Sequence, residues 1–358
     1  MNNQDAINIK TPIVLGFAAF VIIIAGIMHA ESVITQLLMA FFVSIVCAQP
    51  IVWLLKKKVP QSLAVTIVLL LIITLFIGFG ELIGTSLSSF SEDAPKYEQN
   101  LNEMGATLFQ FLQKNGINLS MNKISSILDP SRVMELTAEL LRQLGGFMGN
   151  TLTIFFLVFF LLLELDSVAL KAKAISENTN ISLSYLNTIG QSIRHYLSIK
   201  TMTSLLTGFL IWIGLSIIGV DYAIIWAMIA FLLNYIPNIG SIIAAIPAVL
   251  FALVQLELGG AIWTIVVFVF VNVVIGNMVE PKMMGKGLGL STFVVFVALI
   301  FWGFILGTVG MFLSVPLTMA IKIVLEQNDK TKWIAVILGT KEDALAIMDD
   351  GKHQESDT

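Results

Sequence analysis

Charged side chains are scarce in this sequence. Asp, Glu, Lys and Arg together make up 12% of its 358 residues, whereas an ordinary soluble domain carries about 25%. So few charges cannot cover a water-exposed surface, which excludes a soluble globular protein. The net charge of −4 is small, and the basic residues lie in short segments. We therefore expect a lipid bilayer as the main partner, and no nucleic acid.

Residues that bind metals or perform catalysis are also few. The single cysteine, Cys47, excludes a disulfide within the chain and a cysteine metal site. The histidines, His29, His195 and His353, are far apart in the sequence. There is no His-Glu-x-x-His motif, no nucleophile elbow and no phosphate loop ending in Gly-Lys-Ser/Thr. We expect no enzyme, no cofactor, no metal site and no use of ATP by this chain alone.

Apolar runs dominate what is present, and 57% of the residues are hydrophobic. Most runs are long enough to cross a hydrocarbon core about 30 Å thick. They predict an all-α polytopic membrane protein with about eight transmembrane helices and a C-terminal hairpin or re-entrant pair. The predicted spans are 11–29, 33–55, 62–86, 147–165, 201–219, 222–236, 238–256 and 260–279, followed by an oversized run at 291–325. Bends in that last run are expected at Gly303, Gly307, Gly310 and Pro316.

The segments between the runs predict the domain organisation. The insert at 87–146 shows helical periodicity at Leu101, Met104 and Leu108, and Asp129-Pro130 predicts the start of a second helix. Another amphipathic stretch, 183–197, predicts an interfacial helix. The predicted divisions are an N-terminal three-span unit (1–86), an extracytoplasmic amphipathic helical insert (87–146), the fourth span (147–165), a cytoplasmic interfacial helix (166–200), a core with broken helices and the terminal hairpin (201–325), and a cytoplasmic polar tail (326–358).

Lysines predict the orientation in the membrane. Short cytoplasmic loops are rich in Lys and Arg, and Lys56-Lys57-Lys58 marks one such side. With that side in the cytoplasm, Lys10, Lys200 and Lys282 also fall inside, and the short loops near Glu31, Asp221 and Glu257 fall outside. Both termini are then cytoplasmic, in a multi-pass protein of the plasma membrane.

A polar, helix-breaking octet, 234–241, lies between two apolar runs, with Pro237 inside it and Pro247 following. Proline removes a backbone donor and disrupts a helix. Irregular backbone at membrane depth survives only inside protein or beside a water-filled cavity, and broken helices form solute sites in many transporters. An ordinary loop between spans six and seven is the alternative at this point.

The eighth span carries polar groups at a regular spacing. Asn272, Gly276 and Glu280 recur every four residues and would share one face of an α-helix, with Asn277 beside them. Polar residues within a span usually face the interior of the bundle. Asparagine can bind a neutral polar solute, and Glu280 can carry a proton or a cation. The alternative is that Glu280 ends the helix and pairs with Lys282 at the interface.

Several of these motifs, in this order, resemble the signature of the autoinducer-2 exporter family. They are Tyr235-Ile-Pro-Asn-Ile-Gly240, Ala245-Ile-Pro-Ala-Val249, Val279-Glu-Pro-Lys-Met-Met-Gly285, Gly307 to Gly310, and Val315-Pro-Leu317. The resemblance implies a polytopic bacterial transporter, similar to exporters of the quorum-sensing signal autoinducer-2 and to members described as sodium/proton antiporters. It also implies a homo-oligomer, as a pentamer. Many members carry His-Pro where this chain has Ser291-Thr292, so a role of that dipeptide does not transfer.

Together these patterns favour secondary transport of a small polar solute or a monovalent cation, with or without protons, and Glu280 as the titrating acid. A non-transporting membrane scaffold is the alternative from another class. The expected path residues are Asn234, Pro237, Asn238, Gly240, Ser241, Asn272, Asn277 and Glu280. The expected interfacial or gating residues are Lys282, Gly285, Gly307, Gly310 and Pro316.

Overall fold

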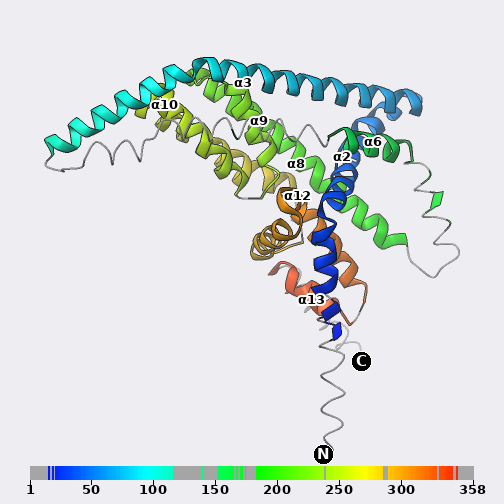
Figure 1. Ribbon diagram of the computed structural model, residues 1–358. Coiled ribbons are helices and arrows are strands. Elements are labelled where there is room, and N and C mark those ends of the chain that lie inside the picture. Colours follow the sequence, from blue (N-terminus) through cyan, green and yellow to red (C-terminus); the bar gives the residue numbers. More distant parts are fainter. Residues whose placement is uncertain are drawn as a thin grey trace, which may run out of the picture. The chain divides into compact units, whose positions relative to one another are not determined.

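Helices make up all the regular structure in the described part of the chain, which confirms the predicted all-α class. The computed structural model describes residues 15–16, 18–19, 21–115, 139, 151–164, 167, 170–171, 174, 183–237, 239–284, 289–328, 330–341 and 344–345. Its helices are α2 (Glu31–Lys56), α3 (Gln61–Lys114), α6 (Thr151–Leu163), α8 (Leu183–Ile218), α9 (Ala223–Leu233), α10 (Gly240–Val271), η1 (Asn272–Val279), α11 (Glu280–Met284), α12 (Thr292–Glu326) and α13 (Lys332–Leu338) (Figure 1).

Five stretches of the described chain are helical, long and apolar enough to cross a membrane, and α6 and α9 are shorter apolar helices. The chain is therefore a multi-pass membrane protein. It divides into two compact units. Unit 1 comprises Met1–Ser44, Thr153–Ile193 and Gly289–Thr358, and unit 2 comprises Ile45–Leu152 and Arg194–Leu288. Unit 2 contains the large buried core around Trp226 and Phe251, and those predicted path residues that the structure describes.

The third span continues far beyond its predicted end at residue 86. α3 is one helix of 54 residues, with Pro95 inside it, and Figure 1 shows it as an unbroken ribbon. Its continuation is held by packing within unit 2, because Tyr97 and Leu101 are buried and the rings of Tyr97 and Phe251 lie 5.1 Å apart. The first helix predicted for the insert is thus the end of α3. The second, after Pro130, falls outside the described residues.

The predicted interfacial helix and the fifth span also form a single helix, α8, of 36 residues. The helix passes through Lys200 without a break, so this residue does not lie in a loop.

Spans seven and eight are two arms joined by a sharp bend within α10. The backbone at Glu257 has φ 58° and ψ −160°, which is not helical. The hydroxyl of Ser241, near the start of the first arm, donates a 3.0 Å hydrogen bond to Oδ1 of Asn272 at the end of the second. In a straight helix these residues would stand about 45 Å apart. The arms are therefore antiparallel, as the predicted spans 238–256 and 260–279 require.

The terminal hairpin is confirmed within α12, in unit 1. Leu306 and Gly307 have non-helical backbone, and Gly307 has φ 58°. A Cβ atom built on Gly310 would lie 1.9 Å from the carbonyl oxygen of Trp302, so the chain folds back tightly on itself. Pro316 lies buried inside the second arm, where the helix continues through it. The bend is thus at 306–307, one of the sites that the glycines predicted.

Candidate functional site

α8 carries a buried polar stripe made of Lys200, Thr203, Ser204 and Thr207. Steps of three and four residues place them on one face of the helix. Each is at most 4% exposed. Buried polar groups in a membrane helix are expensive and usually mark a function. The stripe was missed in the sequence, although the spacing Lys-x-x-Thr-Ser-x-x-Thr was visible there.

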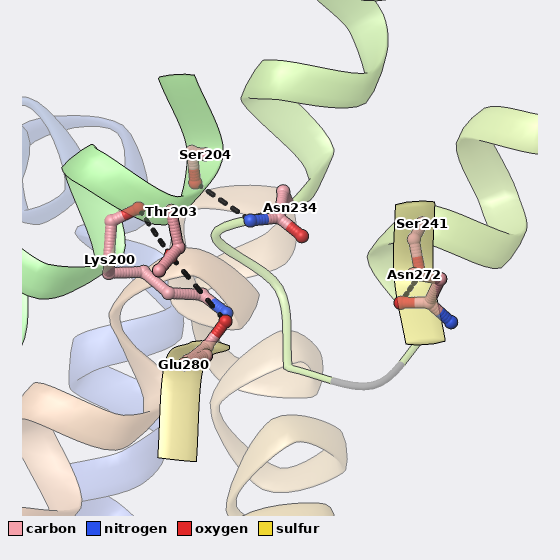
Figure 2. Close-up of polar contacts among 7 residues, drawn as sticks. All are labelled: Lys200, Thr203, Ser204, Asn234, Ser241, Asn272 and Glu280. Carbon is pink, nitrogen blue, oxygen red and sulfur yellow. Dashed lines mark hydrogen bonds and ion pairs between the residues drawn. The ribbon is translucent and has the colours of Figure 1, made fainter. Parts of the chain in front are cut away.

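Glu280 pairs with Lys200 at the start of this stripe. The Lys200 ammonium donates to Glu280 Oε1 at 2.7 Å, and the side chains are 5% and 15% exposed. The hydroxyl of Thr203 lies 3.5 Å from Glu280 Oε2. Figure 2 shows this ion pair beside the chain segment that links α9 and α10. Lys282 is exposed, so the partner of Glu280 is the buried lysine of α8.

Asn234 forms a second contact with the stripe at the end of α9. Its amide donates a 3.0 Å hydrogen bond to the hydroxyl of Ser204, and both residues are buried. The hydroxyl of the next residue, Tyr235, donates to Thr201 Oγ1 at 2.9 Å. The segment that follows turns back so tightly that a Cβ atom on Gly240 would lie 1.8 Å from the carbonyl oxygen of Leu233. Glycine is therefore required at position 240.

A third polar contact, between Ser241 and Asn272, does not involve α8. Figure 2 shows it on the other side of the α9–α10 connection from Asn234. Asn272 begins a π-helical segment, η1. Such segments are rare and often occur at functional sites. A Cβ on Gly276 would lie 3.1 Å from Asn272 Oδ1, so glycine leaves room for this side chain. Asn277 is exposed.

Several expected site residues therefore come together, and others do not. Asn234, Gly240, Ser241, Asn272 and Glu280 all belong to unit 2. Asn234 and Glu280 contact α8, and Ser241 contacts Asn272. Pro237 is partly buried in the α9–α10 connection. Gly307, Gly310 and Pro316 belong to unit 1. Asn238 and Gly285 lie outside the described residues.

Helix lengths give the depth of these contacts. At the opposite end of unit 2, the backbone N–H of Asp221 donates to Gln255 Oε1, and Gln255 Nε2 donates to the carbonyl oxygen of Gly219. Counting back along each helix at 1.5 Å per residue places Ser204, Asn234 and Ser241 all about 20 Å from this end, and Lys200 about 28 Å from it. The ion pair thus lies about 8 Å further from the Asp221 end of unit 2 than the amide contacts do.

This arrangement offers hydrogen-bond donors and acceptors in a part of the protein that is otherwise apolar. Amides and hydroxyls can bind a hydroxyl-rich solute without requiring a charge on it. The carboxylate of Glu280, the hydroxyl of Thr203 and the carbonyl oxygen of Lys200, which accepts from that hydroxyl at 3.2 Å, provide oxygen ligands. Among the described residues, no three His, Cys, Asp or Glu side chains gather into a metal site.

Comparisons with known proteins show the family of this chain. Residues 17–329 match the family model described as AI-2E family transporter. A provisionally named transport protein of Haemophilus influenzae is 39% identical over 95% of this chain and 99% of its own length. The AI-2 transport protein TqsA of Escherichia coli is 36% identical over 92% of this chain and 95% of its own length. YhhT of E. coli, a second provisionally named transport protein, is 37% identical over 91% and 94%. The chain is a membrane transporter and belongs to the AI-2E transporter family.

Proposed function

We propose that this protein is a secondary transporter that exports a small polar solute through unit 2, and that the solute is autoinducer-2 or a compound like it. The observation that supports this most is the buried stripe of Lys200, Thr203, Ser204 and Thr207, which meets Asn234 and Glu280 beside the α9–α10 connection. A helix that only anchors a scaffold has no need of buried polar residues at membrane depth. The name of TqsA supports the choice of solute.

The chemistry of the contacts favours a solute without net charge. Asn234 and Asn272 each provide an amide, and Ser204 and Ser241 each provide a hydroxyl, so the site can both donate and accept hydrogen bonds. The two charges nearby, on Lys200 and Glu280, neutralise each other. Export against a gradient would draw on an ion gradient, since the sequence has no phosphate loop. We expect transport and no catalysis.

Exchange of sodium or another monovalent cation for protons is the second candidate function. It is favoured by one observation, the oxygen atoms of Glu280, Thr203 and the Lys200 carbonyl that lie close together. A buried carboxylate can alternate between a proton and a cation. In this structure, however, the ammonium of Lys200 already pairs with the carboxylate.

We place the protein in the bacterial plasma membrane with both termini in the cytoplasm. Lys56, Lys57 and Lys58 are exposed, and the Lys57 ammonium lies 5.7 Å from the ring centre of Trp53. Tryptophan and lysine at a helix end are typical of the membrane interface, and lysine marks its cytoplasmic side. We also propose a homo-oligomer, as a pentamer, on the family resemblance.

Transport by the purified protein in liposomes tests this function. Vesicles loaded with autoinducer-2 should release it faster with the protein than without it, and a parallel assay should follow sodium-driven proton flux. Glu280→Gln should impair the flux that depends on this site. Glu326→Gln is the matched control, because Glu326 pairs with Lys322 in unit 1 and is 39% exposed. Equal release from protein-free vesicles, with no cation flux, would contradict both candidate functions.

A further inference from the structure

The Lys200–Glu280 pair places a cation of the protein itself where a transported cation would bind. Lys200 approaches from α8, whereas Glu280 stands at the end of η1, 80 residues later. The lysine is 4% exposed, so its ammonium cannot extend into water as a long side chain near a membrane boundary usually does. It is instead held against the carboxylate.

The surroundings of the ammonium resemble a site for a small monovalent cation. Glu280 Oε1 accepts from the ammonium, Oε2 lies near the hydroxyl of Thr203, and that hydroxyl donates to the carbonyl oxygen of Lys200. Thr203 is fully buried. In many transporters, carboxylates, hydroxyls and backbone carbonyls beside a broken helix coordinate sodium. One carboxylate suits a single positive charge, and the absence of a three-ligand cluster in the described residues argues against a divalent ion.

From this geometry we propose that Lys200 is a tethered counter-cation that keeps monovalent cations away from Glu280, and that removing its charge creates a sodium site there. The proposal deepens the proposed function, because it makes Lys200 the residue that sets the charge selectivity of the path. A buried carboxylate that loses its partner is strongly destabilising unless another cation takes the place of that partner. With Lys200 present the site is neutral, and with Lys200 removed it carries a net charge of −1.

Thermal unfolding in detergent tests the cation site without any transport measurement. Lys200→Met is compared with the unaltered protein in sodium chloride and in choline chloride at equal ionic strength. Sodium should raise the unfolding midpoint of Lys200→Met by about 3 °C relative to choline, because a ligand that binds the folded state stabilises it. The unaltered protein should show no difference between the two salts. Lys200→Arg, which keeps the charge, should also show none.

Charge balance provides the second comparison. In the double variant Lys200→Met/Glu280→Gln no buried charge is left unpaired, so it should be more stable than Lys200→Met in choline and should lose the sodium effect. Lys171→Met is the control for loss of a lysine, because Lys171 is 68% exposed and pairs with Glu164 in unit 1.

Two results would overturn the proposal. One is equal stabilisation by sodium of the unaltered protein and of Lys200→Met, which would mean that Lys200 does not keep sodium away from Glu280. The other is failure of both Lys200→Met and the smaller Lys200→Ala to fold in sodium as well as in choline, because bound sodium is expected to replace the ammonium. In liposomes, Lys200→Met should carry sodium faster than the unaltered protein. Sodium binding without any flux would support the cation site and count against the proposed transport path.

Discussion

Tyr97 of α3 donates a 3.0 Å hydrogen bond to Oδ2 of Asp221, in the turn between α8 and α9 and 124 residues further along the chain. A neighbouring bond links the Tyr222 hydroxyl to Asp93 Oδ2 at 2.9 Å. These two tyrosines and Phe251 pack ring against ring. These hydrogen bonds and ring contacts hold the polar end of α3 against the end of unit 2 opposite the ion pair. They explain why the helix continues beyond its apolar span.

The Tyr97–Asp221 bond should contribute measurably to stability. Tyr97→Phe keeps the ring packing and removes only the donor, so we expect a loss of about 1.5 kcal/mol, typical of a hydrogen bond to a charged group. The unfolding midpoint in detergent would fall by about 3 °C. Gln99→Ala is the control, since the exposed Gln99 donates a hydrogen bond to Glu103 of the same helix. Equal midpoints for Tyr97→Phe and the unaltered protein would contradict this assignment.

Gly240 should tolerate no side chain. A methyl group at this position would overlap the backbone of Leu233, where the nearest atom would be 1.8 Å away. Gly240→Ala should therefore sharply reduce the yield of folded protein, measured by fluorescence-detected size exclusion. Gly78→Ala within α3 is the matched control, because nothing lies within 4 Å of a Cβ there. Alanine favours a helix over glycine by about 1 kcal/mol, so the control should match or exceed the unaltered protein. Similar yields for both variants would count against the tight turn.

Hydropathy predicted where the chain crosses the membrane better than where its helices end. The bend at Glu257 falls where the sequence turns from apolar to Glu257-Leu-Gly-Gly260, so two arms could be expected. The span predicted at 62–86 continues as one helix to Lys114, because a drop in hydropathy marks the edge of the bilayer and not the end of a helix. Contacts such as Tyr97–Phe251 support the polar part of the helix, and no local pattern reveals them.

The candidate site was predicted in part, for a similar reason. Asn234, Ser241, Asn272 and Glu280 stood out as polar residues within apolar surroundings. Lys200 did not, because a lysine beside an apolar run has the same sequence signature whether it reaches into water or is buried. Its partner lies 80 residues away. The even spacing from Asn272 to Glu280 also assumed an α-helix, whereas η1 is a π-helix, in which residues four apart do not stay in line.

Asn234 should matter more for transport than the other asparagines near it. Asn234→Leu removes the amide that bonds to the buried hydroxyl of Ser204. In the proposed path the same amide binds the solute, and loss of one solute hydrogen bond of about 1.4 kcal/mol corresponds to about a tenfold loss of solute flux in liposomes. Asn277→Ala should lose less, because Asn277 is exposed.

The control for this comparison is Asn328→Ala, an exposed asparagine after α12 in unit 1. It should transport as well as the unaltered protein. Each variant is first checked for a single peak in size exclusion, so that misfolding is separated from loss of function. A folded Asn234→Leu variant with full flux would remove Asn234 from the path.

Orientation can be tested with single cysteines, because the one native cysteine, Cys47, is buried. In a Cys47→Ala background, Glu257→Cys and Lys57→Cys each place one thiol at an exposed position. In the proposed topology the lysines at 56–58 lie on the cytoplasmic side, so a membrane-impermeant maleimide should label the Glu257→Cys variant in intact cells. It should label Cys at 57 only after the membrane is permeabilised, and the Cys47→Ala background should remain unlabelled. The reverse pattern would invert the proposed topology.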